Sequence, residues 1–131
     1  MTKQKSNFLF YFVGFLIVAG IGFVLWDNNN KPGKYDELTS CMAGSGAKMY
    51  GAWWCPHCND QKQDFGKSWK IFADAGGYVE CSTAERQQTE ICKQAGIDSY
   101  PTWRFADGSE LSGKVDIYNL AQKSGCTEKL I

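Results

Sequence analysis

The 131-residue sequence predicts one α/β domain, with a mixed central sheet flanked by helices, behind a single N-terminal transmembrane helix. An uncharged apolar segment covers residues 8–26, and short apolar runs alternate with amphipathic segments beyond residue 47. A Cys-x-x-Cys motif joins the first of these runs to the first amphipathic segment. Alternating strand and helix patterns of this kind are typical of layered α/β folds.

Residues 8–26 can cross a bilayer, because 19 helical residues cover about 28 Å and the hydrocarbon core is roughly 30 Å thick. A cleaved signal peptide is the alternative, but the segment exceeds the usual apolar length and ends in bulky residues up to Trp26. We therefore expect a retained anchor, with residues 1–7 as a cytoplasmic tail, residues 27–40 as a linker and residues 41–131 as the domain.

The charges beside this segment do not decide its orientation, since Lys3 and Lys5 precede it and Lys31 and Lys34 follow it. Six cysteines indicate an oxidising compartment, because reducing cytosol disfavours disulfides. We therefore expect the domain on the extracytoplasmic side, periplasmic or lumenal. Acidic and basic residues number 14 each, so nucleic acid is not expected as a partner.

The first predicted strand covers residues 48–54 and leads into a helix that begins at Pro56, a residue that fits the first helical turn. Aromatic residues spaced i, i+4 and i+7 predict its buried stripe, with Gln61 among the polar residues around them. Gly66 weakens the helix. The stripe consists of Phe65, Trp69 and Phe72.

The rest of the chain predicts four elements, each bounded by a turn or cap signal. They are a strand at 78–81, a helix opened by a capping box at 82–85 and ended by Gly96, strands at 100–105 and 110–112, and a helix capped by Asp116 and ended by Gly125. Asp107-Gly108 is a hairpin signal, so the last two strands are expected to pair.

The Cys-Pro-His-Cys motif at residues 55–58 carries the expected chemistry. Unpaired N–H groups at the helix N-terminus stabilise a thiolate at Cys55, and His57 can add a positive partner. Cys58, one turn further on, is expected to be the resolving thiol, and Pro56 shapes the turn. A disulfide between the two cysteines is small enough to open and close, so this chemistry requires no further cofactor.

Metal-binding uses of these cysteines fit the spacing less well. A zinc site with Cys81 and Cys92 would lack a second Cys-x-x-Cys pair. A c-type haem requires a histidine directly after Cys58, and Asn59 stands there. We therefore expect no metal.

Trp-Cys-Pro-His-Cys at 54–58, followed by Tyr-Pro-Thr at 100–102, resembles the thioredoxin superfamily over residues 47–125. The resemblance implies a thioredoxin-like fold and a thiol-disulfide oxidoreductase acting on the cysteines of client proteins. It also implies a cis Pro101 against the active-site cysteines. The backbone of Tyr100, with Trp54 beside it, is then expected to bind an extended substrate by strand addition.

More narrowly, four segments resemble the thioredoxin-like domain found fused to bacterial vitamin K epoxide reductase homologues: residues 48–58, 78–81, 91–92 and 95–97. This implies electron transfer from client cysteines to a quinone-linked membrane enzyme of that type. It also implies a structural disulfide between Cys81 and Cys92. The pairing of Cys41 with Cys126 stays open, since either can be a free or intermolecular thiol.

The sequence departs from the family six residues before Cys55, where many relatives carry a buried Asp or Glu and this chain has Met49. Glu80 could substitute from a neighbouring strand, or it could be a solvated charge. The Pro-His dipeptide is that of strongly oxidising relatives and favours disulfide formation. A reductase or isomerase of the same fold is one alternative, and a non-catalytic binding module with structural disulfides is another.

Overall fold

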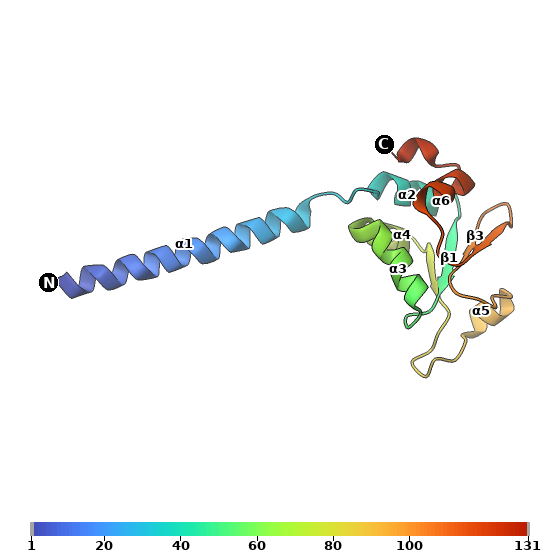
Figure 1. Ribbon diagram of the computed structural model, residues 1–131, viewed down its shortest axis with the longest axis horizontal. Helices are drawn as coiled ribbons and strands as arrows, with labels where there is room; N and C mark the ends of the chain where they lie inside the picture. Colours follow the sequence, from blue (N-terminus) through green and yellow to red (C-terminus); the bar gives the residue numbers. More distant parts are fainter. Residues whose placement is uncertain (1, 131) are drawn as a thin grey trace. The chain divides into compact units, whose positions relative to one another are not determined.

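The computed structural model describes residues 2–130 and divides into two compact units between Lys31 and Pro32. Helices and strands alternate through the second unit (Figure 1). In chain order the elements are α1 (Thr2–Asn30), α2 (Asp36–Gly44), β1 (Lys48–Gly51), α3 (Pro56–Phe65), the 3-10 helix η1 (Gly66–Ser68), α4 (Trp69–Asp74), β2 (Tyr78–Glu80), α5 (Glu90–Gln94), β3 (Thr102–Arg104), β4 (Glu110–Ser112), α6 (Ile117–Ser124) and the 3-10 helix η2 (Thr127–Lys129).

Helix α1 forms the first unit, and its stretch Asn7–Asn30 is long and apolar enough to cross a membrane. Its large apolar side chains lie exposed, as Phe8 (73%) and Trp26 (64%) illustrate. The helix continues beyond residue 26, where the linker is predicted, as far as Asn30, and an exposed ion pair joins Asp27 to Lys31 at 2.8 Å. It also includes residues 2–7 of the predicted tail; Met1 and the side chains of residues 2–6, Lys3 and Lys5 among them, lie outside the described part.

The second unit is built on a four-stranded mixed sheet in the order β2-β1-β3-β4. Strand β1 pairs parallel with β2 and antiparallel with β3, and β3 pairs antiparallel with β4. The left-handed Gly108 (φ 81°) and its N–H bond to the Phe105 carbonyl form the hairpin turn at 107–108. The predicted α/β architecture, its mixed sheet and this hairpin are therefore confirmed.

The two faces of the sheet bury different side chains, because successive residues of a strand point to opposite sides. Met49 lies in the main core with apolar residues of α2, α3, α4 and α6. Tyr50 lies in a smaller cluster with Ile97 and the Cys81–Cys92 pair, on the side of α5. Helices thus cover both faces, as Figure 1 shows for α3 and α5.

Two helical predictions were wrong in extent. The helix expected from Pro56 onward is interrupted at Gly66, whose φ of 55° is left-handed and ends α3 before η1 and α4 continue the chain. The helix expected from residues 82–85 begins only at Glu90. Residues 83–87 form a turn instead, with Arg86 in a left-handed conformation (φ 61°) and a hydrogen bond from the Gln87 N–H to the Thr83 hydroxyl. This hydroxyl therefore stabilises a loop and does not cap a helix.

Helix α2 begins in the range predicted to be linker, residues 27–40, and continues into the predicted domain. Leu38 and Met42, spaced i and i+4, are fully buried in the main core, so this segment belongs to the domain. The last helix, α6, agrees with its predicted caps. The Asp116 carboxylate accepts a 2.9 Å hydrogen bond from the Asn119 N–H, and Gly125 adopts the left-handed conformation (φ 74°).

Candidate active site

Cys55 occupies the N-cap position of α3. Its extended backbone (φ −77°, ψ 120°) is the usual N-cap geometry, and Pro56 takes the first helical position, where no N–H is needed. The Cys55 carbonyl accepts the first intrahelical bond, 3.1 Å from the Asn59 nitrogen. Cys55 is 6% exposed, and as the N-cap residue it directly precedes the unpaired N–H groups of the first helical turn.

Cys58 lies one turn further into α3 and is fully buried in the main core. Both Cys55 and Cys58 are free thiols. Burial raises the pKa of Cys58 to about 12, helped by its neighbour Cys55 and opposed by a backbone hydrogen bond at Ala52 and by the charge of Lys62. Cys58 is therefore a protonated thiol at neutral pH and needs a proton acceptor before it can attack a disulfide.

The Tyr100-Pro101 peptide bond is cis and lies beside the motif. The thiol of Cys55 donates a hydrogen bond to the Tyr100 carbonyl, with a sulfur to oxygen distance of 3.7 Å. Pro101 is buried, and the ring of Tyr100 meets that of Trp54 edge-on at 6.3 Å between centroids. The fold thus brings together Cys55, Cys58, Trp54, Tyr100 and Pro101 from two distant parts of the chain.

His57 occupies a different position from the other motif residues. Its side chain is exposed on the first turn of α3, and Pro56 beside it is exposed as well. The remaining surface of the site consists of aromatic rings: Trp53 and Trp54 are 46% and 37% exposed. A hollow beside Trp54 continues past Tyr100 to Arg86 and Asp98.

The turn after β2 holds these tryptophans in place, which the sequence did not suggest. The indole N–H of Trp54 donates to the Ser82 hydroxyl at 2.7 Å, and that of Trp53 donates to the Thr83 carbonyl at 3.1 Å. The guanidinium of Arg86 stacks on both rings, at 5.5 and 5.9 Å from their centroids. The sequence does not predict this contact, because it depends on the left-handed backbone of Arg86, which only the structure reveals.

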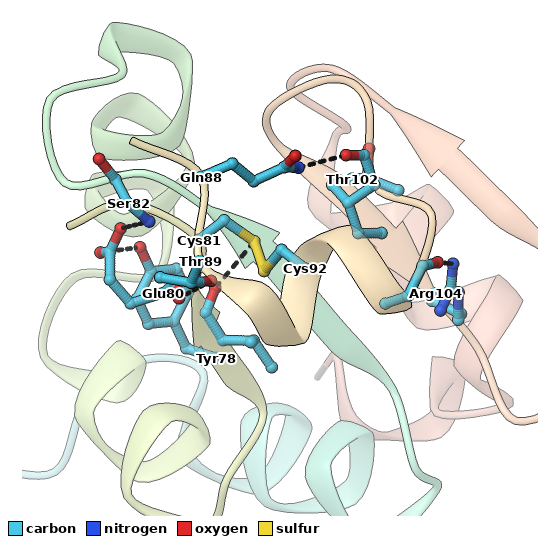
Figure 2. The surroundings of a disulfide bond; sticks show 12 residues. Tyr78, Glu80, Cys81, Ser82, Gln88, Thr89, Cys92, Thr102 and Arg104 are labelled. Atoms are coloured by element: carbon cyan, nitrogen blue, oxygen red, sulfur yellow. Dashed lines mark hydrogen bonds between the residues drawn. A yellow bond between two sulfur atoms is a disulfide. The ribbon is translucent and has the colours of Figure 1, made fainter. Parts of the chain in front are cut away.

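Glu80, which the sequence left open as a substitute carboxylate, is half-buried and accepts three hydrogen bonds. Its Oε2 accepts from the Tyr78 hydroxyl at 2.7 Å. Its Oε1 accepts from the backbone N–H of Trp53 at 3.1 Å and of Ser82 at 3.0 Å. Figure 2 shows the Tyr78 and Ser82 bonds converging on this carboxylate. Met49 is fully buried in the core.

The other four cysteines form two disulfides outside the motif. Cys81 and Cys92 join the end of β2 to α5, with Cα atoms 5.5 Å apart (Figure 2). Cys41 and Cys126 join α2 to the segment after α6, with Cα atoms 6.0 Å apart. Within residues 2–130 there is no group of three or more His, Cys, Asp or Glu side chains placed to hold a metal ion.

Gln61 is another residue whose role the sequence did not reveal. It was predicted on the polar side of its helix, but it is fully buried. Its amide donates to the Val115 carbonyl at 3.0 Å and accepts from the Val115 N–H at 2.8 Å and the Trp103 indole N–H at 3.3 Å. Three residues after Cys58, this side chain ties the active-site helix to the segment before α6.

No protein-family model matches the chain. Over 92 residues, 67% of its length, it is 42% identical to thiol-disulfide oxidoreductase LTO1 of Arabidopsis thaliana. The match covers 23% of that relative, so the chain spans about a quarter of the relative's length. The chain is therefore related in sequence to part of a thiol-disulfide oxidoreductase.

Proposed function

We propose that this chain is a membrane-anchored thiol-disulfide oxidoreductase whose redox centre is a Cys55–Cys58 disulfide that opens and closes during turnover. The observation that carries the proposal is the position of two free, closely spaced thiols at the N-terminus of α3. Cys55 lies at the helix N-terminus, where unpaired backbone N–H groups stabilise a thiolate, and Cys58 lies one turn further along the helix. No cofactor beyond the disulfide is required.

In the proposed reaction a client thiolate attacks the Cys55 sulfur of the disulfide. The Cys55–Cys58 bond breaks, its electron pair leaves on Cys58, and Cys58 takes a proton. A second client thiolate then attacks the client sulfur bound to Cys55 and releases the new client disulfide. Two electrons now reside in the Cys55–Cys58 dithiol, and a quinone-linked membrane partner of the vitamin K epoxide reductase type would reoxidise it.

Substrate binding is assigned to the surface around Tyr100. The Tyr100 carbonyl oxygen, 3.7 Å from the Cys55 sulfur, can accept a hydrogen bond from a main-chain N–H of an extended client segment. Main-chain pairing of this kind depends little on the client sequence. The exposed ring of Trp54 adds apolar contact next to the reacting sulfur. Pro56 holds the first turn of α3 in shape, and exposed His57 faces solvent, where an incoming client can meet it.

The thioredoxin-like fold and the kinship with vitamin K epoxide reductase-associated domains are part of the same proposal. A mixed sheet in the order β2-β1-β3-β4, a redox motif at the start of α3 and a cis proline before β3 support it. The similarity to part of a plant thiol-disulfide oxidoreductase supports the activity.

The proposed location is a single-pass anchor through residues 8–26, with the N-terminus cytoplasmic and the domain extracytoplasmic. The apolar side chains exposed along α1 support the anchor, since they would lie in water otherwise. Two disulfides in the second unit support an oxidising side of the membrane. Labelling of the cysteines in intact cells with an impermeant thiol reagent, after mild reduction, tests the orientation.

Trapping of mixed disulfides tests the activity. The variant Cys58→Ser should accumulate client proteins bound to Cys55, because Cys58 can no longer displace a bound client by attacking the Cys55 sulfur. These adducts should disappear on reduction and in the double variant Cys55→Ser/Cys58→Ser. An absence of adducts in Cys58→Ser, with the protein folded and present in the membrane, would favour the non-catalytic binding module.

The reduction potential of the Cys55–Cys58 pair tests the direction of electron flow. Thioredoxin has a potential of about −270 mV and the periplasmic oxidase about −120 mV, a gap of roughly 7 kcal/mol for two electrons. Disulfide donation requires a value towards the oxidising end of this range. A potential at or below that of thioredoxin would instead indicate a reductase or isomerase.

A further inference from the structure

In the proposed function, on which this inference rests, the buried thiol of Cys58 must give up its proton. Its thiol is fully buried, and it must lose a proton whenever it attacks a mixed disulfide. Met49, at the position where related proteins carry an acid, is fully buried and has no group that accepts a proton. The proton therefore needs another acceptor close to Cys58.

Gly51 marks where that acceptor lies. A Cβ atom added at Gly51 would be 3.1 Å from the Cys58 sulfur and 3.4 Å from the Tyr78 hydroxyl oxygen. The Cys58 sulfur and the Tyr78 hydroxyl therefore both lie beside the same backbone position, and they are separated by no more than the sum of these two contacts. Glycine at position 51 leaves room there for both groups, because an added methyl group would also lie 3.1 Å from the Tyr78 ring.

The Tyr78 hydroxyl connects this spot to Glu80. It donates to the carboxylate at 2.7 Å, and backbone N–H groups of Trp53 and Ser82 hold the other carboxylate oxygen. All three neighbouring groups are donors, so the Glu80 carboxylate is the acceptor at this end of the contact. Figure 2 shows Glu80 and Tyr78, the last and first residues of β2, side by side.

We propose that Tyr78 and Glu80 form a proton relay that serves Cys58, with Glu80 as the terminal acceptor in place of the missing carboxylate at Met49. When Cys58 attacks the Cys55 sulfur of a mixed disulfide, its proton moves to the Tyr78 oxygen as the Tyr78 proton moves to Glu80. The Cys55–Cys58 bond forms, the bond from Cys55 to the client breaks, and the client leaves as a thiolate. In the opposite direction the same relay returns a proton to Cys58.

The charges around the relay are compatible with this role. Burial and the Glu80 carboxylate raise the pKa of Tyr78 above its usual range, with smaller contributions from Cys58 and Cys55, so its hydroxyl stays protonated. The ammonium of Lys62 lies 4.0 Å from the Tyr78 ring centroid and lowers the pKa of Cys58. Because Glu80 acts through Tyr78, it is a positioning residue rather than a catalytic one.

Stopped-flow reaction of the full-length chain in detergent micelles with dithiobis(nitrobenzoate) tests the relay. The first equivalent of coloured thiolate reports attack by Cys55, and the second reports attack by Cys58 on the mixed disulfide. In Glu80→Gln and Tyr78→Phe the first phase should stay unchanged. The second should slow about 100-fold at pH 7, the lower end of what general-base catalysis supplies.

The pH profile separates proton transfer from a merely structural effect. The deficit of both variants should shrink as pH rises, because hydroxide replaces the lost acceptor. The second phase of the double variant should be no slower than that of the slower single variant, because Tyr78 and Glu80 act in the same proton relay. Gly51→Ala, whose methyl group would crowd both the Cys58 sulfur and the Tyr78 ring, should also slow the second phase. Glu110→Gln, at an exposed ion pair with Arg104, is the matched control and should leave both phases unchanged.

The two proposals fail in different ways. Second-phase rates equal to the unmodified protein's in both Glu80→Gln and Tyr78→Phe, from pH 6 to 9, would overturn the relay and leave the oxidoreductase intact. Absence of both phases in the unmodified protein would instead overturn the proposed function. Thermal melting of each variant verifies that it folds. If Glu80→Gln does not fold, the second-phase rate of Tyr78→Phe alone decides whether the relay operates.

Discussion

Replacing Gln61 by leucine should destabilise the domain strongly, although leucine is apolar and of similar size. The amide of Gln61 is fully buried and makes three hydrogen bonds, to both backbone groups of Val115 and to the indole N–H of Trp103. Leucine fills the volume but leaves all three partners unpaired. Trp103 is itself fully buried, so water cannot take the place of the lost acceptor.

The size of the effect follows from these three partners. An orphaned buried polar group costs about 1–3 kcal/mol. The Trp103 indole is fully buried and Val115 is half-buried, so we expect the free energy of unfolding to fall by about 3 kcal/mol. In a domain of about 100 residues each 1 kcal/mol lowers Tm by about 4–8 °C, which gives a decrease of at least about 12 °C. Stability, rather than the chemistry of Cys58, should account for any loss of activity.

Denaturant unfolding of the full-length chain in micelles, followed by tryptophan fluorescence, measures this change. The control is Gln63→Leu, the same substitution at an exposed position of α3, which should alter stability by about 0.5 kcal/mol or less. If Gln61→Leu unfolds at the same denaturant concentration as Gln63→Leu, the hydrogen bonds of Gln61 do not stabilise the domain.

Further predictions concern the remaining cysteines and the pH range of stability. Replacing Cys41 and Cys126 by serine should destabilise the domain more than replacing Cys81 and Cys92, because the loops closed span 85 and 11 positions; the chain-entropy model gives a difference of about 1.7 kcal/mol, measurable by denaturant unfolding. Equal losses would contradict it. The pKa of Cys58 is about 12 in the folded protein, against 9.0 for an ordinary cysteine thiol, so the unfolded chain releases this proton at lower pH than the folded one. The free energy of unfolding of the reduced protein should therefore not depend on Cys58 below pH 9, where the thiol is protonated in both states. It should fall as pH rises from 9 towards 12, where only the unfolded chain has lost the proton. Cys58→Ala should lack this slope, and an identical alkaline slope in both proteins would refute the assignment.

Local patterns in the sequence were sufficient for several features of the molecule. The apolar run of residues 8–26, the caps of α6 and the hairpin at 107–108 depend on neighbours a few positions apart, so short-range chemistry determines them. The order of strands and helices follows for the same reason. The spacing within the motif at 55–58 also pointed directly to the helix N-terminus at which Cys55 lies.

Only the tertiary structure decided which polar residues are buried and which distant groups meet. Gln61 and Glu80 have nothing in their local sequence that separates them from solvated surface residues, yet partners from other elements enclose both. The approach of Cys58 to Tyr78 requires the parallel pairing of β1 with β2 and a glycine at position 51. The Cys41–Cys126 bridge depends on how α2 and the chain end pack. Such contacts arise from packing between segments far apart in the chain, and no periodicity along the sequence encodes them.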